Sequence, residues 1–284
     1  MHLYKTSKGI VLRNNGTSFL LNDSWDKLIN QQNLHEHLQS MITGSAKMIS
    51  EQESNNLIGN FLMAPIGSQE LWAAGVTYLK SRDARMEESK DSGGADCYQK
   101  VYEADRPELF FKSLPHRVSG HGGKVNIRKD SSWNVPEPEL TIYLNSAGSI
   151  QGYTIGNDMS SRSIEGENPL YLPQAKMYER CAALGPCLYI PANPVSPDTM
   201  IRLKIKRGNE IMFEAETPIS RMKRSLTELA GYLFREFDFA TGCFLMTGTC
   251  LVPPSDFTLQ ENDIVEITID EIGTLTNTIS VKGK

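Results

Sequence analysis

Three acidic residues flank a short turn in the segment VPEPELTIYLNSAGSIQGYTIGND, residues 135–158. Glu137 and Glu139 are two positions apart, so an extended chain places both side chains on one face. Pro138 favours extended geometry at the residue before it and cannot donate to a strand ladder. The Glu-Pro-Glu spacing therefore predicts the edge or the entry of a strand with two carboxylates on one face.

The rest of this segment is expected to form a β-hairpin. If Ala147-Gly148 is its two-residue loop, Glu137 faces Asp158 and Glu139 faces Gly156, and paired Cβ atoms then lie about 4.5–5.5 Å apart. Three carboxylates at such range repel one another, and a hard divalent cation with oxygen ligands resolves the conflict. The alternative is a solvated acidic edge strand, and a one-residue slip would move Asp158 to the other face.

The kind of metal follows from the ligand types. Three carboxylates without a converging histidine favour Mg²⁺ over zinc, with Mn²⁺ or Ca²⁺ able to take its place.

Several motifs in this order resemble the fumarylacetoacetate hydrolase family over about residues 65–284. They are WAAGVTY, PEPEL, GYTIGNDMSSR, a lysine at position 176 and CAALGP. The resemblance implies a β-rich α+β catalytic domain, a mixed β-sandwich roll that is usually homodimeric. It also implies a Mg²⁺ or Mn²⁺ site for a 2-oxo acid or β-dicarbonyl substrate. Glu137, Glu139 and Asp158 fall on the family's metal-ligand positions.

One departure from the family pattern is informative. Hydrolases of this family commonly carry a catalytic histidine after the strand that corresponds to GVTY, and Ser81 stands there in this chain. The segments GVTYLKSRDARMEES and NDMSSRSIEGENPLYLPQAK are more similar to the sugar-acid branch of the family. That branch dehydrates a 2-oxo-3-deoxy-pentonate to 2,5-dioxopentanoate, and we expect this reaction here.

Further residues are candidates for the site, each with a plainer alternative. From the resemblance, Lys176 is expected beside the metal, where its charge stabilises an enolate or it acts as the base. Without the resemblance, the sequence around it is typical of a surface lysine. Arg82 and Arg85 are three apart and suit a substrate carboxylate, or else a solvated helix. Ser81 is a second catalytic candidate, and further substrate-binding candidates are Thr77, Arg162 and Thr249.

Two histidines, His116 and His121, lie in a glycine-containing segment and are expected to be loop residues. Residues 87–102 contain Ser92-Gly93-Gly94 and are expected to form a mobile lid.

Composition restricts the partners. The chain has 284 residues, a net charge of −5 and a sequence pI of about 5.6. These values argue against nucleic acid or an anionic membrane as the main partner. The N-terminus lacks a signal-peptide pattern, and the odd count of five cysteines favours reduced thiols in the cytoplasm. We expect a small accessory domain at 1–64, a catalytic domain at 65–284, and a homodimer.

Two other functions stay open at this point. One is a metal-dependent C–C hydrolase or decarboxylase of acylpyruvate or fumarylacetoacetate type, which shares the enolate but needs a positioned water. The other is a metal-dependent sugar-acid binder without catalysis, which has no use for a group suited to proton transfer.

Overall fold

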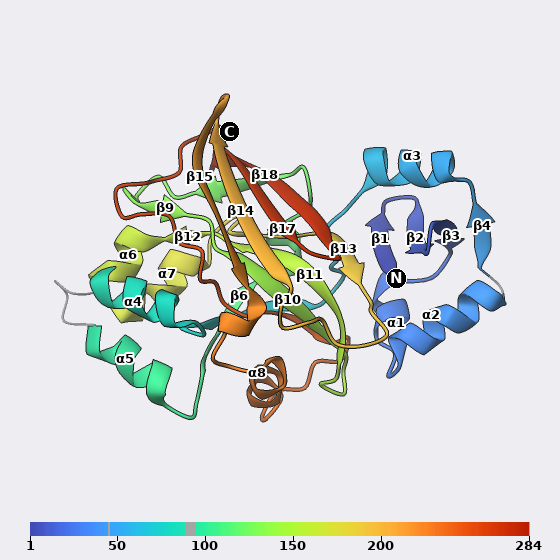
Figure 1. The fold of residues 1–284 in the computed structure, drawn as a ribbon, viewed down its shortest axis with the longest axis horizontal. Helices are drawn as coiled ribbons and strands as arrows, with labels where there is room; N and C mark the ends of the chain where they lie inside the picture. Colours follow the sequence, from blue (N-terminus) through green and yellow to red (C-terminus); the bar gives the residue numbers. More distant parts are fainter. Residues whose placement is uncertain (45, 89–94, 284) are drawn as a thin grey trace.

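The computed structural model describes residues 1–44, 46–88 and 95–283. It has the β-rich α+β architecture that the sequence predicts, with two mixed sheets and short helices around them (Figure 1). The larger sheet runs in the order β4 (Lys47–Ile49), β3 (Thr17–Leu21), β2 (Gly9–Asn14), β1 (His2–Thr6), β13 (Ala182–Tyr189), β11 (Ile150–Asp158), β10 (Pro138–Leu144), β16 (Cys243–Met246), β5 (Glu70–Gly75) and β6 (Glu108–Ser113), and β7 (Val118–Ser119) pairs with β13.

The second sheet runs in the order β15 (Glu210–Pro218), β14 (Met200–Arg207), β17 (Ile264–Ile269), β18 (Gly273–Val281) and β8 (Lys124–Ile127). The core lies between the two sheets, where Leu140 and Ile155 share a cluster with Leu203 and Ile267. Every residue of β10 is buried, so the strand is covered on both faces.

The β10–β11 hairpin has the register that the sequence predicts near the carboxylates, with Glu139 opposite Gly156. Its turn differs from the prediction. Asn145 pairs with Ser149 around a three-residue loop instead of a two-residue one. Gln151 is an extra residue in the opposite strand, because Leu144 faces Ile150 whereas Tyr143 faces Gly152. The longer loop and this bulge compensate each other, so Asp158 keeps the predicted face.

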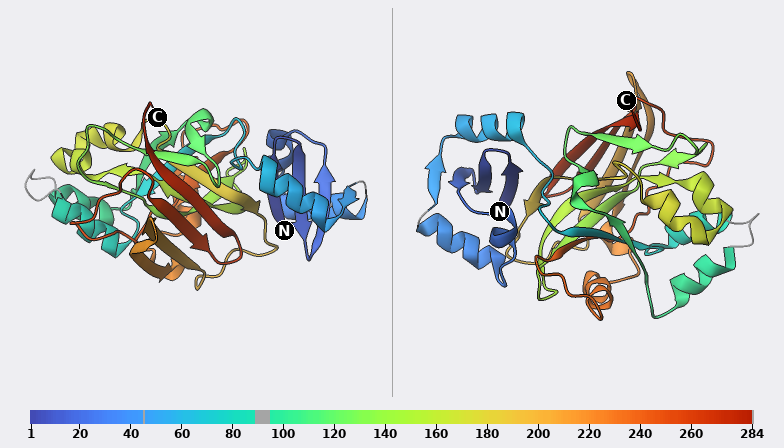
Figure 2. Two further views of the ribbon diagram at one scale, coloured as in Figure 1. Left: turned by 90° about the horizontal axis from the view of Figure 1, so that it is seen from above. Right: turned by 180° about the vertical axis from the view of Figure 1, so that it is seen from behind.

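The N-terminal region lies at one end of the molecule (Figure 2). Its strands continue the large sheet, since β1 pairs with β13 through Leu3 and Leu188. Asn15-Gly16 forms a tight turn, with φ of 46° and 79°. The segment SWDKLINQQNLHEHLQSM has a rough apolar stripe that favours one helix, but the structure has two, α1 (Trp25–Ile29) and α2 (Leu34–Thr43), and α3 (Glu51–Phe61) follows. The division into two domains stays a prediction.

The helices nearest the carboxylates come from two segments. The first comprises α4 (Leu79–Glu88) and α5 (Ala95–Glu103). These helices contain the described part of the expected lid. The rest of that lid, residues 89–94 with Ser92-Gly93-Gly94, lies outside the described residues. The second comprises β12 (Ser160–Ser161), which pairs with β9 (Asn134–Val135), then α6 (Arg162–Glu167) and α7 (Leu172–Lys176). Figure 1 shows both segments on the same side of the sheets.

Two element ends differ from expectation. The apolar run LWAAGVTYL favours a strand that reaches Leu79, but β5 stops at Gly75, because Val76 has a φ of 52° and breaks the extended chain. The spacing of Ser225 and Glu228 predicts a helix cap, and apolar residues continue to Phe237. The helix α8 (Leu226–Leu233) begins at this cap, where Ser225 Oγ accepts from Glu228 N at 3.1 Å, but it ends before Phe234 and Phe237. Within the described residues no helix is long and apolar enough to cross a membrane.

Candidate metal centre

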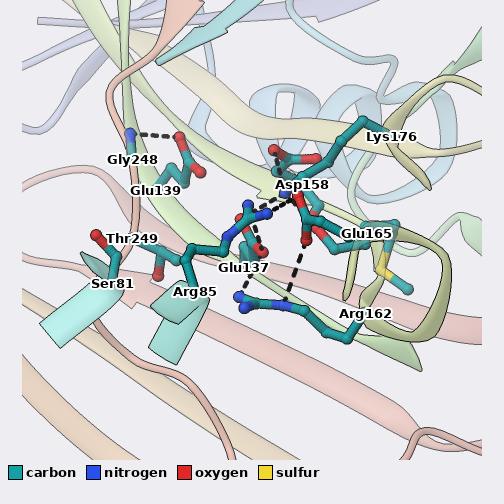
Figure 3. Close-up of polar contacts among 12 residues, drawn as sticks. Ser81, Arg85, Glu137, Glu139, Asp158, Arg162, Glu165, Lys176, Gly248 and Thr249 are labelled. Atoms are coloured by element: carbon teal, nitrogen blue, oxygen red, sulfur yellow. Dashed lines mark hydrogen bonds and ion pairs between the residues drawn. The ribbon is translucent and has the colours of Figure 1, made fainter. Parts of the chain in front are cut away.

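The three predicted carboxylates converge at one end of the β10–β11 hairpin (Figure 3). Glu137, Glu139 and Asp158 each offer an oxygen within 4.8 Å of the others. Their exposed fractions are 4%, 1% and 1%, so the group is shielded from solvent. The Asp158 amide donates to the Glu137 carbonyl at 2.9 Å, which fixes the facing pair. The structure therefore brings together the acids that the hairpin argument predicted.

Glu137 is surrounded by cations. Its Oε1 accepts from Arg162 Nη2 at 2.6 Å and its Oε2 from Lys176 Nζ at 2.8 Å. Arg85 Nη2 is 3.8 Å from the same Oε1. Burial opposes ionisation, but the cations of Lys176, Arg162 and Arg85 outweigh it and hold the pKa of Glu137 well below its ordinary value. Glu137 is therefore a permanent anion.

Glu139 has the opposite environment. Burial and the neighbouring charges of Asp158 and Glu137 raise its pKa well above the ordinary value. Its Oε2 accepts one hydrogen bond, from the Gly248 amide at 2.6 Å. Burial and the two neighbouring carboxylates thus favour the neutral form of Glu139, whereas a divalent cation at the cluster would favour its ionised form.

Asp158 lies between two lysines. Lys112 Nζ approaches Oδ1 at 2.5 Å, and Lys176 Nζ approaches Oδ2 at 3.2 Å. Lys176 also donates to Ser160 Oγ at 2.5 Å. Lys112 and Lys176 are 0% and 1% exposed, and buried charges of this kind require such partners.

This donor set fits a hard divalent cation. All three ligand groups are carboxylates, which suit Mg²⁺ or Mn²⁺ better than zinc. Binding of such an ion would offset the charge that otherwise keeps Glu139 protonated, so the residues present fit the predicted metal. The cavity around them is small, about 10 Å³. Its walls include Gly75, Val76, Ser81, Arg85, Phe110, Arg162, Lys176, Gly248 and Thr249.

Four further predicted residues lie at this pocket. Arg85 is 5% exposed and pairs closely with Glu165, and Arg162 is 1% exposed. The Ser81 hydroxyl donates to the Tyr78 carbonyl at 2.8 Å and accepts from the Tyr78 amide at 3.2 Å, so it closes the first turn of α4. The Thr249 Oγ1 accepts from the Leu251 amide at 3.3 Å.

The structure places the other two predicted residues differently. Thr77 is fully buried, and its Oγ1 donates to the Thr247 carbonyl at 2.7 Å, where it supports the loop that carries Gly248. Arg82 pairs with Asp83 and its guanidinium lies 5.1 Å from the centre of the Tyr102 ring, and it does not line the pocket.

The histidines lie elsewhere. Among the residues that the structure describes, none that lines the pocket is a histidine. His121 is in an exposed loop, where its Nδ1 accepts from the Thr276 amide at 3.2 Å, and His116 is in a short 3-10 turn.

Sequence reasoning missed three charged residues, Glu108, Lys112 and Glu165. Glu108 and Lys112 belong to β6, which the sequence analysis took for an ordinary strand. They alternate with Phe110, so all three share one face, and this period of two was the available signal. Phe110 lines the pocket, 5.8 Å from Lys176 Nζ to the ring centre.

Glu108 has a carboxyl group in an unusual setting. Its Oε2 is shielded from solvent and has no hydrogen-bond partner among the described residues. It packs against Gly75, where an added Cβ would sit 2.0 Å from this oxygen. Burial raises the pKa of Glu108; Arg85 and Lys176 lower it, and Glu137 and Asp158 raise it further. Glu108 does not itself line the pocket, but Gly75, against which it packs, does.

Known proteins share this chain's fold and sequence. The fumarylacetoacetate (FAA) hydrolase C-terminal family matches residues 83–280. A Haloferax volcanii protein called probable 2-keto-3-deoxyxylonate dehydratase is 45% identical over 246 residues, which cover 86% of this chain and 82% of that protein. The 2-dehydro-3-deoxy-D-arabinonate dehydratase of Saccharolobus solfataricus is 44% identical over 224 residues, 78% of this chain and 74% of its own.

A solved structure gives the same picture. The structure of 2-keto-3-deoxy-D-arabinonate dehydratase complexed with magnesium and 2,5-dioxopentanoate is 34% identical, with a TM-score of 0.82, and covers 100% of this chain and 99% of that one. With a family match over most of its length and relatives this similar, the chain belongs to the fumarylacetoacetate hydrolase family.

Proposed function

We propose that this protein is a metal-dependent hydro-lyase that converts a 2-oxo-3-deoxy-pentonate into 2,5-dioxopentanoate and water. The observation that carries the proposal is the identity of 45% and 44% with two dehydratases of such acids, over most of the chain. The oxygen-only cluster of Glu137, Glu139 and Asp158 supports it, because a magnesium-bound structure of one such dehydratase shares the fold.

We assign the metal to these three carboxylates. When bound, Mg²⁺ supplies Lewis-acid stabilisation of the negative charge that develops on the 2-oxo group. The protein's own cations serve the rest of the anionic substrate. Arg85 and Arg162 line the same pocket as the carboxylates, and guanidinium groups suit the planar carboxylate of an oxo acid.

We assign Glu108 as the base. Its buried, unpartnered oxygen is free to accept a proton, and burial raises its pKa towards the range in which a carboxylate is an effective base. The sequence alone favours Lys176 as the base. Its ammonium is held by Glu137, Asp158 and Ser160, so it suits a donor and a counter-charge better than an acceptor.

The reaction then balances as follows. Glu108 accepts a C3 proton, and the C4–O bond breaks as the hydroxyl takes a proton, with Lys176 as the nearest donor, and leaves as water. The resulting 3-ene has an alcohol at C5. Transfer of a proton from C5 to C3 gives a C4–C5 enol, and its tautomerisation gives the aldehyde of 2,5-dioxopentanoate. No oxidant or second substrate is consumed.

Hydrolysis of a C–C bond is the less supported alternative. It needs a water that is held and deprotonated over a carbonyl carbon, and histidine is the usual group for this in the family. Ser81 occupies the corresponding position and its hydroxyl is engaged with Tyr78. A serine hydroxyl is too weakly basic to activate water at neutral pH.

The test is an assay of purified protein with both C4 enantiomers of the 2-oxo-3-deoxy-pentonate, in Mg²⁺ and in excess chelator. We expect 2,5-dioxopentanoate to form with Mg²⁺ from one enantiomer, and no product in chelator. Absence of product from both enantiomers at saturating Mg²⁺ would reject the proposed activity.

We also propose a cytoplasmic homodimer. The family resemblance supports the dimer. All five cysteines are free thiols, and four of them are buried. Free thiols support a reducing compartment.

A further inference from the structure

Lys112 is a charged side chain that neither the sequence nor the proposed reaction explains. It lies in β6 and is 0% exposed. It is not one of the residues that line the pocket. Burying an ammonium costs free energy unless its protons are hydrogen-bonded and its charge is paired with an anion.

Its three neighbours meet both requirements. The Nζ of Lys112 lies 2.5 Å from Asp158 Oδ1 and donates to the Met159 carbonyl at 3.0 Å. It also donates to the main-chain carbonyl of Lys176. Two hydrogen bonds to main-chain carbonyls and one ion pair with Asp158 thus hold the ammonium. Lys112 therefore ties one metal-ligand candidate to the backbone of the lysine beside the metal.

Lys176 differs from Lys112 in what holds it. Its Nζ is held by Glu137, Asp158 and Ser160, and the two carboxylates are both metal-ligand candidates. A cation bound by these acids would weaken their hold on the Lys176 ammonium. The two hydrogen-bond acceptors of Lys112 are main-chain carbonyls, which are outside the candidate ligand set and which a cation at the cluster would leave in place.

We propose that Lys112 is a positioning residue that fixes the backbone from which Lys176 reaches the substrate. The inference rests on the proposed function for its effect on turnover. Its effect on metal binding requires no substrate.

The distinguishing experiment uses Lys112→Met, which keeps the length of the side chain and removes its charge. Mn²⁺ is the probe, titrated by electron paramagnetic resonance, and kcat is measured with the 2-oxo-3-deoxy-pentonate. We expect kcat to fall about tenfold or more, the usual size of an outer-shell effect. We expect Mn²⁺ to bind as tightly as in the wild type or more tightly, because a neighbouring positive charge has gone.

A matched control is Arg207→Met. Arg207 pairs with the fully buried Asp263 at 2.8 Å and donates to the Thr258 carbonyl at 3.0 Å, in the second sheet and away from the pocket. It should lower the melting temperature without changing kcat or Mn²⁺ affinity. If Lys112 is only a structural counter-charge, Lys112→Met will resemble this control.

The outcomes separate cleanly. Unchanged kcat, or Mn²⁺ binding weakened tenfold, would overturn the inference. If Lys112→Met is unfolded both with and without Mn²⁺, Lys112→Arg decides, because it keeps the charge but not the geometry. Slower turnover with wild-type Mn²⁺ affinity supports positioning, and wild-type turnover or weaker Mn²⁺ binding overturns it. A wild-type protein that binds Mn²⁺ but does not turn over the acid would reject the proposed function alone.

Discussion

Among single residues, Glu139 shows how metal binding and protonation are linked. Its raised pKa means that the folded, metal-free protein holds a proton that the unfolded chain releases at lower pH. The stability that this neutral acid contributes is present below its unfolded pKa and is lost as the pH rises through its raised folded pKa. A cation must displace that proton, so protons and metal compete for the site.

The first prediction follows from this competition. The rise in melting temperature produced by a fixed Mg²⁺ concentration should be smaller on the acid side of the raised pKa of Glu139, where the carboxyl stays protonated, and should increase as the pH rises through that pKa. Thermal melts with Mg²⁺ and with chelator across this range measure it. A Mg²⁺ effect that is constant or falls as the pH rises would contradict the assignment of Glu139.

Replacing Glu139 by Gln provides the second prediction. The amide resembles the protonated acid, so the melting temperature without metal should stay within a few degrees of the wild type. Mg²⁺ should no longer stabilise the variant, and turnover should be lost because one of the three ligands has gone. A variant that is strongly destabilised without metal would show that Glu139 is ionised in the metal-free protein.

The third prediction concerns Glu108. Glu108→Gln removes the proposed base and should lower kcat by about 100-fold or more, the usual contribution of general-base catalysis. Mg²⁺ affinity should be nearly unchanged, since Glu108 is outside the ligand set. In the wild type, turnover should rise with pH through the raised pKa of Glu108, because only the ionised form accepts a proton. A variant with more than a tenth of wild-type kcat would reject this base.

Much of the site was predictable at this scale, and the limit was the type of pattern used. The metal candidates stood out because Glu137, Glu139 and Asp158 are close in sequence and share a hairpin. Arg85 could be predicted because it follows the GVTY motif, and Arg162 because it ends the motif GYTIGNDMSSR. Lys112 and Glu108 come from a strand distant in sequence, and only the pairing of β6 with β5 brings them close to residues that line the pocket.

Among the elements, the β10–β11 hairpin decides whether the acids meet. The sequence predicted the correct pairing of Glu139 with Gly156 from an incorrect turn. Turn residues identify that a hairpin exists, whereas the bulge at Gln151 depends on how β11 also pairs with β13. The same limit explains the strand predicted to reach Leu79, because nothing in the local sequence favours a positive φ at Val76.

The loop after β16 gives the fourth prediction. Gly248 has a φ of 96°, and an added Cβ would lie 2.0 Å from Thr77 Oγ1. Gly248→Ala should therefore shift the amide that donates to Glu139, weaken Mg²⁺ binding about tenfold and lower stability by about 1–3 kcal/mol. Titration with Mn²⁺ and a urea melt measure both effects.

Ser225→Ala is the matched control for this loop variant. It removes the cap of α8, a helix outside the pocket, and should cost about 1 kcal/mol without changing Mn²⁺ affinity. If both variants leave the affinity unchanged, the Gly248 amide does not position Glu139.

For the whole molecule, sequence composition predicted the class of fold and the family motifs predicted its roll-like form. The place of the N-terminal region was harder to predict, because a domain boundary at residue 64 does not indicate which strands pair across it. In the structure β1 lies beside β13 and extends the same sheet that holds β10 and β11. The first strands therefore support the scaffold of the site, although they contribute no residue to the pocket.

The central claim is that this site dehydrates a sugar-derived oxo acid instead of cleaving a C–C bond. Both reactions start from a metal-bound 2-oxo acid, so the metal does not distinguish them. The most direct test compares turnover of a 2-oxo-3-deoxy-pentonate and of an acylpyruvate by the same preparation at saturating Mg²⁺. The account predicts release of 2,5-dioxopentanoate and little cleavage of the acylpyruvate. Faster C–C cleavage than dehydration would contradict it.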